Sequence, residues 1–258
     1  MTTVATETCV PTPDPAMMLN EFVSHIEEDH DVAVETDADG ARYIENSGHR
    51  ITFSAVDAGL RIRLTGPGPE MMVFFKDAIA QHVAEFDEEV AKSLRWTGET
   101  SVEGALPENF RILTLQAKSE PMPGLVRVTV TVENATLFEA DGLHLRLMLP
   151  ATPGRAPVWP RMGPNGAPFW PQGEDRLHDR YITIRHARPE VGELDLDVVS
   201  HGEGLISGWA SGADIGGQIG SMGPVGETAL PEARDYLLIA DQSGLPAVAR
   251  LLENIPKG

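Results

Sequence analysis

The stretch that decides the fold runs from Arg176 to Ala210: RLHDRYITIRHARPEVGELDLDVVSHGEGLISGWA. It predicts two β-strands, Tyr181–Arg188 and Glu193–Ser200. Pro189 and Gly192 lie between them, and such residues are typical of a turn between two antiparallel strands. The stretch therefore predicts a hairpin that is followed by a glycine-rich bend.

The bend, at residues 201–204, leads to a helix that is expected to begin at about Ser207. The first turn of a helix has backbone N–H groups without partners and the positive end of the helix dipole, so it favours an anion. Arg180 and Arg185 on the first strand add two guanidinium groups. This combination suits a pyrophosphate, and therefore a phosphate-bearing aromatic cofactor.

These residues resemble the flavin-binding part of the siderophore-interacting proteins, a branch of the ferredoxin-reductase-like flavoenzymes. That family carries Arg-x-Tyr-Thr/Ser-x-Arg on a barrel strand, then a strand end of the type Asp-Phe-Val-x-His-Gly, then a turn ending in Trp-Ala. The matching segments here are Arg180 to Arg185, Asp197 to Gly202, and Gly208 to Ala210. One position departs from the pattern: the family's tyrosine is Ile182, and the tyrosine stands one place earlier, at Tyr181. Neighbouring side chains on a strand point to opposite faces, so the shift changes the expected flavin contact.

The resemblance implies that FAD is the cofactor, that NAD(P)H is the electron donor, and that no side chain acts as an acid or base. Arg180 is expected to pair with the pyrophosphate and Thr183 to contact the flavin edge. The amides from Ser207 to Ala210 are expected to receive negative charge, and Ser243 to face the ring from the other side. The implied cofactor-binding residues are Arg180, Ile182, Thr183, Ile184, Arg185, Val199, His201, Gly202, Ser207, Gly208, Trp209, Ala210, Asp241 and Ser243.

Composition limits the classes of partner. The chain has 258 residues, of which 41% are hydrophobic and 23% charged, as is usual for a soluble globular protein large enough for two domains. A formal charge of −19 argues against a nucleic acid or an anionic membrane surface as partner. A single cysteine, Cys9, excludes an internal disulfide framework and any cysteine-based metal cluster. Because no long apolar run or basic leader is found, the cytoplasm is the expected location.

The first hundred residues predict a small α+β domain. Residues 1–15 are expected to form a flexible tail. Residues 16–97 are expected to form a helix, a β-meander that begins with a strand at Val32–Thr36, and a second helix from Glu70 to about Glu89. This domain resembles a small bacterial domain of unassigned function that is sometimes fused ahead of siderophore-interacting proteins. Scattered histidines such as those here are usually surface or cap residues, so no metal site is predicted; the four considered are His25, His30, His49 and His82.

Residues 98–107 are expected to be a linker, and residues 108–230 a flavin-binding domain. Strict alternation along Leu125–Glu133 and Leu143–Leu149 predicts antiparallel strands and hence a β-barrel. The Pro- and Gly-rich loop from Ala151 to Gly173 matches a loop of similar length in the resembled family. Its two Trp-Pro pairs are expected to cap the barrel end.

Residues 231–258 are expected to begin an α/β nucleotide-binding domain. The apolar run Asp235–Asp241 predicts a buried parallel strand, and Leu245 to about Asn254 predicts a helix. The turn between them resembles the family's Asp-Glu-Thr-Ala-Leu-Pro-Ala segment, with Gln242 and Ser243 in place of Glu and Thr. One strand and one helix cannot form a doubly wound sheet, so most of the nicotinamide-binding domain is expected to be absent, in a natural short form or a truncated one.

Two functions are compatible with these residues. In the first, the chain is a FAD-dependent, NAD(P)H-linked reductase that takes a ferric siderophore or chelate as substrate and releases iron as Fe(II). In the second, the barrel is a scaffold that has lost turnover, and the chain is a non-catalytic or regulatory binding module. Ile182 favours the second alternative.

Overall fold

A computed structural model describes residues 3–30, 32–46, 48–98, 102–140, 142–200, 204–226, 230, 233 and 235–255. The chain divides into two compact units, each described below by itself. The first comprises residues 1–109 and 160–169, and the second residues 110–159 and 170–258. None of the helices in the described ranges combines the length and the apolar character needed to span a bilayer.

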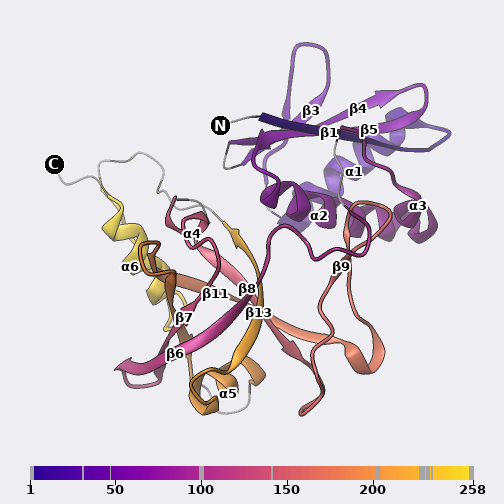
Figure 1. Ribbon diagram of the computed structural model, residues 1–258. Coiled ribbons are helices and arrows are strands. Elements are labelled where there is room, and N and C mark those ends of the chain that lie inside the picture. Colours follow the sequence, from indigo (N-terminus) through magenta and orange to yellow (C-terminus); the bar gives the residue numbers. More distant parts are fainter. Residues whose placement is uncertain are drawn as a thin grey trace. The chain divides into compact units, whose positions relative to one another are not determined.

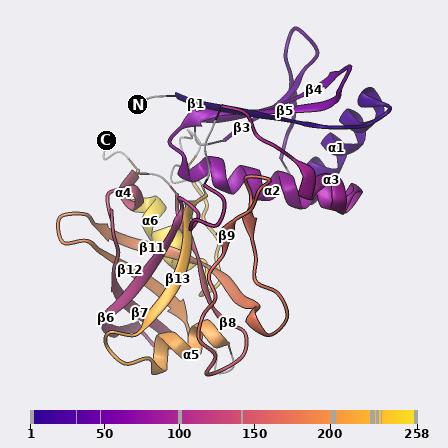
Figure 2. The ribbon, with the colours of Figure 1, turned by 45° about the vertical axis from the view of Figure 1, so that its right-hand side comes forward.

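The described residues of the first unit form a five-stranded antiparallel sheet in the order β1-β5-β4-β3-β2. Figures 1 and 2 show helices α1 and α2 on one face of this sheet. The elements are β1 (Thr3–Val10), α1 (Pro15–His30), β2 (Glu35–Thr36), β3 (Arg42–Asn46), β4 (His49–Val56), β5 (Gly59–Pro67), α2 (Glu70–Phe86) and α3 (Glu88–Ser93). The core lies between helices and sheet, where Phe22 of α1 and Met72 of α2 meet Phe53 of β4 and Ile62 of β5. The predicted α+β architecture is confirmed.

The prediction of a flexible tail over residues 1–15 was wrong for Thr3–Val10. This segment is strand β1, paired with β5 along its whole length from Thr3↔Pro67 to Val10↔Leu60. Thr6, Thr8 and Val10 are buried on alternate positions. The buried members of the pattern are mostly threonines, so the alternation was masked by their polar side chains, although threonine fits a pleated surface well.

Two other boundaries of the first unit differ from the prediction. The expected strand Val32–Thr36 is limited to Glu35–Thr36. The second helix ends at Phe86, because the backbone of Asp87 is extended and the Asp87 carboxylate caps a new helix, α3, by accepting from the amides of Glu89 and Val90. The capping aspartate explains why one predicted helix is two.

Within the described part of the second unit, six antiparallel strands close into a barrel in the order β11-β12-β7-β6-β13-β8. Its elements are β6 (Phe110–Met122), β7 (Leu125–Thr131), α4 (Leu137–Ala140), β8 (His144–Pro150), η1 (Gly173–Asp175), β11 (Leu177–Arg188), β12 (Glu193–Val199), α5 (Leu205–Gly212), β13 (Gln218–Val225) and α6 (Leu245–Glu253). Leu113, Val128, Leu145 and Leu196 are fully buried inside it. The predicted antiparallel barrel is confirmed.

The long loop is divided between the two units. Residues 160–169 belong to the first unit and interrupt the predicted 108–230 domain. They form the short hairpin β9 (Arg161–Met162) and β10 (Pro168–Phe169). Met162 exchanges backbone hydrogen bonds with Gly104 and Ala105, and Asn165 donates to the Ala91 carbonyl. Trp159 stays on the barrel, where its ring centroid lies 5.3 Å from that of Phe110.

The expected buried parallel strand at Asp235–Asp241 was wrong. Residues 236–240 form no strand, and Leu237 and Ile239 are each 85% exposed. A parallel strand needs hydrogen-bonded neighbours, and no strand in the described ranges pairs with this run. The helix after it is confirmed as α6, Leu245–Glu253.

Candidate functional site

An open cavity of about 470 Å³ lies in the second unit, where β11, the end of β12 and the start of α5 meet the turn before α6. These elements carry most of the stretch from Arg176 to Ala210. The cavity is lined by His144, His178, Arg180, Tyr181, Ile182, Thr183, Asp197, Val198, Val199, Gly204, Ile206, Ser207, Ser243 and Gly244.

Strand β11 supplies the cationic side of the cavity. Its first half pairs with β8 and its second half with β12, and the register of the β12 pairing shifts between Ile184 and His186. Arg180 is exposed, and its Nη1 donates to the carbonyl of Asp179 at 2.7 Å. Thr183, which follows Tyr181 by two residues and is therefore closer to the register shift, is buried. The arginine therefore presents its guanidinium at the cavity while the threonine is held in the barrel wall.

Tyr181 and Ile182 both contribute to the lining, although neighbouring strand side chains point to opposite faces. Ile182 lies opposite Leu145 and packs against the barrel core. Tyr181 lies opposite Arg146 and is 52% exposed. The aromatic ring missing at position 182 is thus present at the same cavity, one residue earlier and on the solvent side.

Helix α5 begins two residues earlier than predicted. Its N-cap is Gly204, which provides no capping side chain, and the first helical residue is Leu205. The amides of Leu205, Ile206 and Ser207 are the ones expected to lack helical partners, since that of Gly208 already donates to the Gly204 carbonyl at 2.7 Å. An anion at this helix start would therefore meet residues 205–207.

Six of the described residues that were predicted to bind the cofactor are absent from the cavity lining: Ile184, Arg185, Gly208, Trp209, Ala210 and Asp241. Gly208 and Trp209 belong to later positions of α5, and Ala210 is buried in the barrel core. Ile184 is likewise fully buried in that core. The early start of α5 explains why Gly208, Trp209 and Ala210 do not line the cavity, because each lies past the helix turn that faces it. His201 and Gly202 were also predicted to bind the cofactor, and they lie outside the described residues.

Arg185 is held by an ion pair rather than directed at the cavity. Its Nη1 and Nη2 donate to Oε2 and Oε1 of Glu253 at 2.8 and 2.6 Å. Nearby, the buried Arg250 donates to the carbonyls of Ile184 and Phe138 at 2.8 and 3.0 Å. Both arginines fasten α6 to the barrel, so only Arg180 of the predicted pair lines the cavity.

The turn before α6 closes another side. Asp241 Oδ1 accepts from the Ser243 hydroxyl at 2.6 Å, and from the amides of Ser243 and Gly244 at 2.9 and 3.1 Å. The bond from the Ser243 hydroxyl is the main cause that lowers the pKa of Asp241. Ser243 and Gly244 line the cavity, whereas Asp241 organises the turn behind them.

Sequence reasoning missed the two histidines of the lining. His144 on β8 and His178 on β11 both have a lowered pKa, chiefly because burial disfavours the charged imidazole. His144 occupies an outward position in the alternation of its strand, which was the available signal. Asp197 was missed as a lining residue too; it is neutralised by a two-point ion pair with Arg127 at 2.6 and 2.8 Å. Arg180 is therefore the cation that the lining presents to an anion.

The residues fit a flavin nucleotide. A dinucleotide needs a cation and backbone donors for its pyrophosphate, and polar groups near the ring. The cavity offers Arg180, the first turn of α5, and the hydroxyls of Thr183 and Ser243.

Two family models match the chain. The model of the siderophore-interacting FAD-binding domain matches residues 114–228, which include β11, β12 and α5. The model of an uncharacterized protein conserved in bacteria, DUF2218, matches residues 7–97, within the first unit. Both predicted resemblances are confirmed, each over its own part of the chain.

Curated relatives match part of their length. The ferric vibriobactin reductase ViuB of Vibrio cholerae is 34% identical over 160 residues, which cover 57% of this chain and 54% of that protein. The NADPH-dependent ferric-chelate reductase of Escherichia coli is 33% identical over 156 residues, covering 57% and 58%. The solved siderophore-interacting protein SipS from Aeromonas hydrophila is 28% identical, covers 57% and 55%, and has a TM-score of 0.45. The chain spans about half the length of the curated relatives it matches.

Proposed function

We propose that this chain, which carries a siderophore-interacting FAD-binding domain behind a DUF2218 domain, is the flavin-binding part of a ferric-siderophore reductase. The observation that carries the proposal is the cavity on β11 and α5, since Arg180, Thr183 and the first turn of the helix meet there within the matched residues. The names of the two reductase relatives support the reaction class.

Each part of the cavity has a role in this proposal. Arg180 pairs with the pyrophosphate, because a guanidinium donates to two phosphate oxygens at once. The amides of residues 205–207 donate to the same group at the helix start. Thr183 and Ser243 hydrogen-bond the polar edge of the ring, and Tyr181 covers its apolar face. Ile182 adds an aliphatic contact.

FAD held by Arg180, Thr183 and the first turn of α5 would supply the redox chemistry, in which one NAD(P)H is oxidised for every two Fe(III) reduced to Fe(II). The chain's own side chains bind and orient the cofactor, and none is assigned a proton-transfer role. The substrate class is a ferric siderophore or chelate, and dependence on NAD(P)H places the reaction in the cytoplasm.

Titration of the purified full chain with FAD tests the binding step. The proposal expects saturable binding of one FAD per chain, with a shifted flavin absorption spectrum and a change in flavin fluorescence. FMN should bind more weakly, because it lacks the pyrophosphate that Arg180 and α5 hold. A chain that shows no saturable FAD binding would overturn the proposal.

A second assay separates the reductase from a binding module that has lost turnover. Ile182 at the usual tyrosine position favours the binding module. NADH or NADPH is added to the FAD-loaded chain with a ferric chelate, and Fe(II) is trapped with a colorimetric chelator. Fe(II) formation above the rate with free FAD supports the reductase. FAD binding without that excess rate supports the module, and photoreduction of the bound flavin then shows whether ferric iron accepts its electrons.

A further inference from the structure

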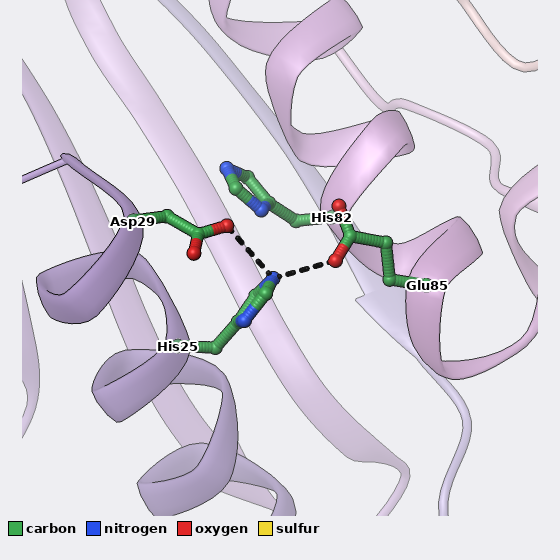
Figure 3. A group of neighbouring side chains, drawn as sticks. All are labelled: His25, Asp29, His82 and Glu85. Atoms are coloured by element: carbon green, nitrogen blue, oxygen red, sulfur yellow. Dashed lines mark ion pairs between the residues drawn. The ribbon is translucent and has the colours of Figure 1, made fainter.

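Four side chains of the first unit converge between helices α1 and α2: His25, Asp29, His82 and Glu85 (Figure 3). Each offers one nitrogen or oxygen atom, and these four atoms all lie within 4.8 Å of one another. The group is called the His25–Glu85 cluster below. It shares no residue with the flavin site, which belongs to the second unit.

Helical spacing explains how the cluster forms. His25 and Asp29 are four residues apart on α1, and His82 and Glu85 are three apart on α2, so each pair occupies one helix face. Both helices pack on the same sheet and share one hydrophobic core. The rings of His25 and His82 stand edge to face with centroids 5.2 Å apart. The backbone therefore holds the two imidazoles together whether or not the carboxylates take part.

The cluster has a buried base and an accessible rim. His82 is buried, and the side chain of His25 is 25% exposed. Those of Asp29 and Glu85 are 46% and 56% exposed. An ion can therefore enter from solvent on the side of the exposed carboxylates, which are free to adjust. The more buried imidazoles are held rigidly on the inner side.

Nε2 of His25 is the centre of the arrangement. It lies 3.0 Å from Glu85 Oε2 and 3.4 Å from Asp29 Oδ2. Dashed lines mark both ion pairs in Figure 3. Yet this buried nitrogen makes no hydrogen bond with any described residue. Around a tetrahedral ion with bonds of about 2.0–2.1 Å, neighbouring ligand atoms are about 3.3 Å apart. The two measured separations are close to that spacing.

We propose that the His25–Glu85 cluster binds one divalent first-row transition metal ion, with two imidazole nitrogens and two carboxylate oxygens as ligands. Imidazole suits zinc and its neighbours in the series, whereas calcium and magnesium favour sites made entirely of oxygen. Two carboxylates balance the charge of a divalent ion, which makes the loaded site neutral. The proposal is independent of the flavin function.

The competing explanation is an ion pair alone, in which a protonated His25 lies between Asp29 and Glu85. Such partly exposed pairs contribute little to stability. The two explanations can be distinguished by experiment. Only the metal site requires His82 as a ligand, and only the metal site requires His25 to be neutral.

Zn²⁺ titration of the full chain, stripped with a chelator and freed of any histidine tag, is the first test. The proposal expects one high-affinity site per chain by calorimetry, unaffected by millimolar Mg²⁺. Asp29→Asn and Glu85→Gln keep side-chain shape and should each weaken Zn²⁺ binding at least about 10-fold. Glu28→Gln, which removes an exposed carboxylate from α1 next to the cluster, should leave the affinity within about 2-fold.

Two further readouts locate the ion and guard against misfolding. Without metal, the wild type, Glu85→Gln and Glu28→Gln should have nearly the same Tm. Addition of Zn²⁺ should raise the Tm of the wild type and of Glu28→Gln much more than that of Glu85→Gln. Nitrogen-15 NMR of the imidazoles should show His25 and His82 shifting together on Zn²⁺ addition, and Co²⁺ should give the visible absorption of a low-coordinate ion.

Three results would overturn the proposal. The first is absence of saturable Zn²⁺ and Co²⁺ binding. The second is equal affinity in wild type, Asp29→Asn and Glu85→Gln. The third is a set of Zn²⁺-induced NMR shifts that leaves His82 unchanged, because the proposed site needs both imidazoles as ligands.

Discussion

Arg185 and Glu253 form a two-point ion pair between strand β11 and helix α6, with Nη···Oε distances of 2.8 and 2.6 Å. The hydrogen bond from Arg185 is the main cause that lowers the pKa of Glu253. The arginine side chain is only 13% exposed. Although two arginines of β11 match the flavin motif, the structure gives them different partners.

The first prediction compares the two arginines in FAD binding. Arg180→Ala should weaken FAD binding by about 10-fold or more, since a charge-assisted hydrogen bond contributes about 1.5–3 kcal/mol. Arg185→Ala should weaken it by less than about 3-fold, because that guanidinium is engaged with Glu253. Fluorescence titration measures both, with Arg176→Ala, an exposed arginine of the same stretch, as the matched control. A larger loss for Arg185→Ala than for Arg180→Ala would contradict the assignment.

The second prediction concerns the ring end of the cavity. Tyr181→Leu should weaken FAD binding about 5- to 10-fold, since contact with an aromatic face contributes about 1 kcal/mol beyond buried area. It should also raise the fluorescence of bound flavin, because a neighbouring tyrosine quenches it. Ile182→Val is the matched control at the same lining and should change affinity by less than about 2-fold. If Tyr181→Leu leaves both affinity and fluorescence unchanged, the ring binds elsewhere.

The third prediction tests strand β1. Val10 is almost fully buried at the end of the strand, opposite Leu60. Val10→Ala should lower the unfolding free energy of the first unit by about 2 kcal/mol, from lost burial and the cavity left behind. Thr3→Ala, at an exposed position of the same strand, should stay within about 0.5 kcal/mol. Hydrogen exchange of β5 amides measures the stability loss in both variants. Equal protection in Val10→Ala and Thr3→Ala would mean that Thr3–Val10 is a flexible tail.

The barrel was predictable from local pattern. Alternation along Leu125–Glu133 and Leu143–Leu149 records which face of each strand is buried, and burial is what the closed barrel imposes on those residues. The same logic failed at Leu237 and Ile239, because an apolar run indicates a buried strand only when other strands lie beside it. The apolar character of a segment can be read from its own residues, whereas strand pairing depends on segments elsewhere in the chain.

The sites were predictable only in part, for a related reason. The spacings His25 to Asp29 and His82 to Glu85 place each pair on one helix face, but nothing in either spacing brings the two faces together. Arg185 illustrates the opposite case: its motif position suggested a phosphate ligand, and a residue 68 positions later, Glu253, took the guanidinium instead. Contacts between distant segments decide such assignments.

The last prediction rests on a buried carboxylate in the barrel wall. Asp195 accepts two hydrogen bonds from Arg188, both at 2.7 Å, and one from Thr129 at 2.8 Å. Burial alone would raise the pKa of Asp195, but the hydrogen bonds from Arg188 and Thr129 outweigh it and hold the pKa well below its usual range. The ionised form is therefore the one that the folded barrel stabilises.

The stability contribution of Asp195 should depend on pH in a defined direction. Because its pKa is lower in the folded than in the unfolded chain, the unfolded chain takes up the proton first as pH falls. The contribution is fully present above about pH 5 and is lost progressively below about pH 4. Asp195→Asn should therefore lower the unfolding free energy by about 2 kcal/mol at pH 7, with a smaller deficit at pH 3.

Hydrogen exchange of β12 amides at the two pH values measures the barrel alone. Glu193→Gln removes the more exposed partner of Arg188 and should cost less than about 1 kcal/mol at pH 7. A deficit for Asp195→Asn that is the same at both pH values would show that the charge of the carboxylate is not what stabilises the barrel.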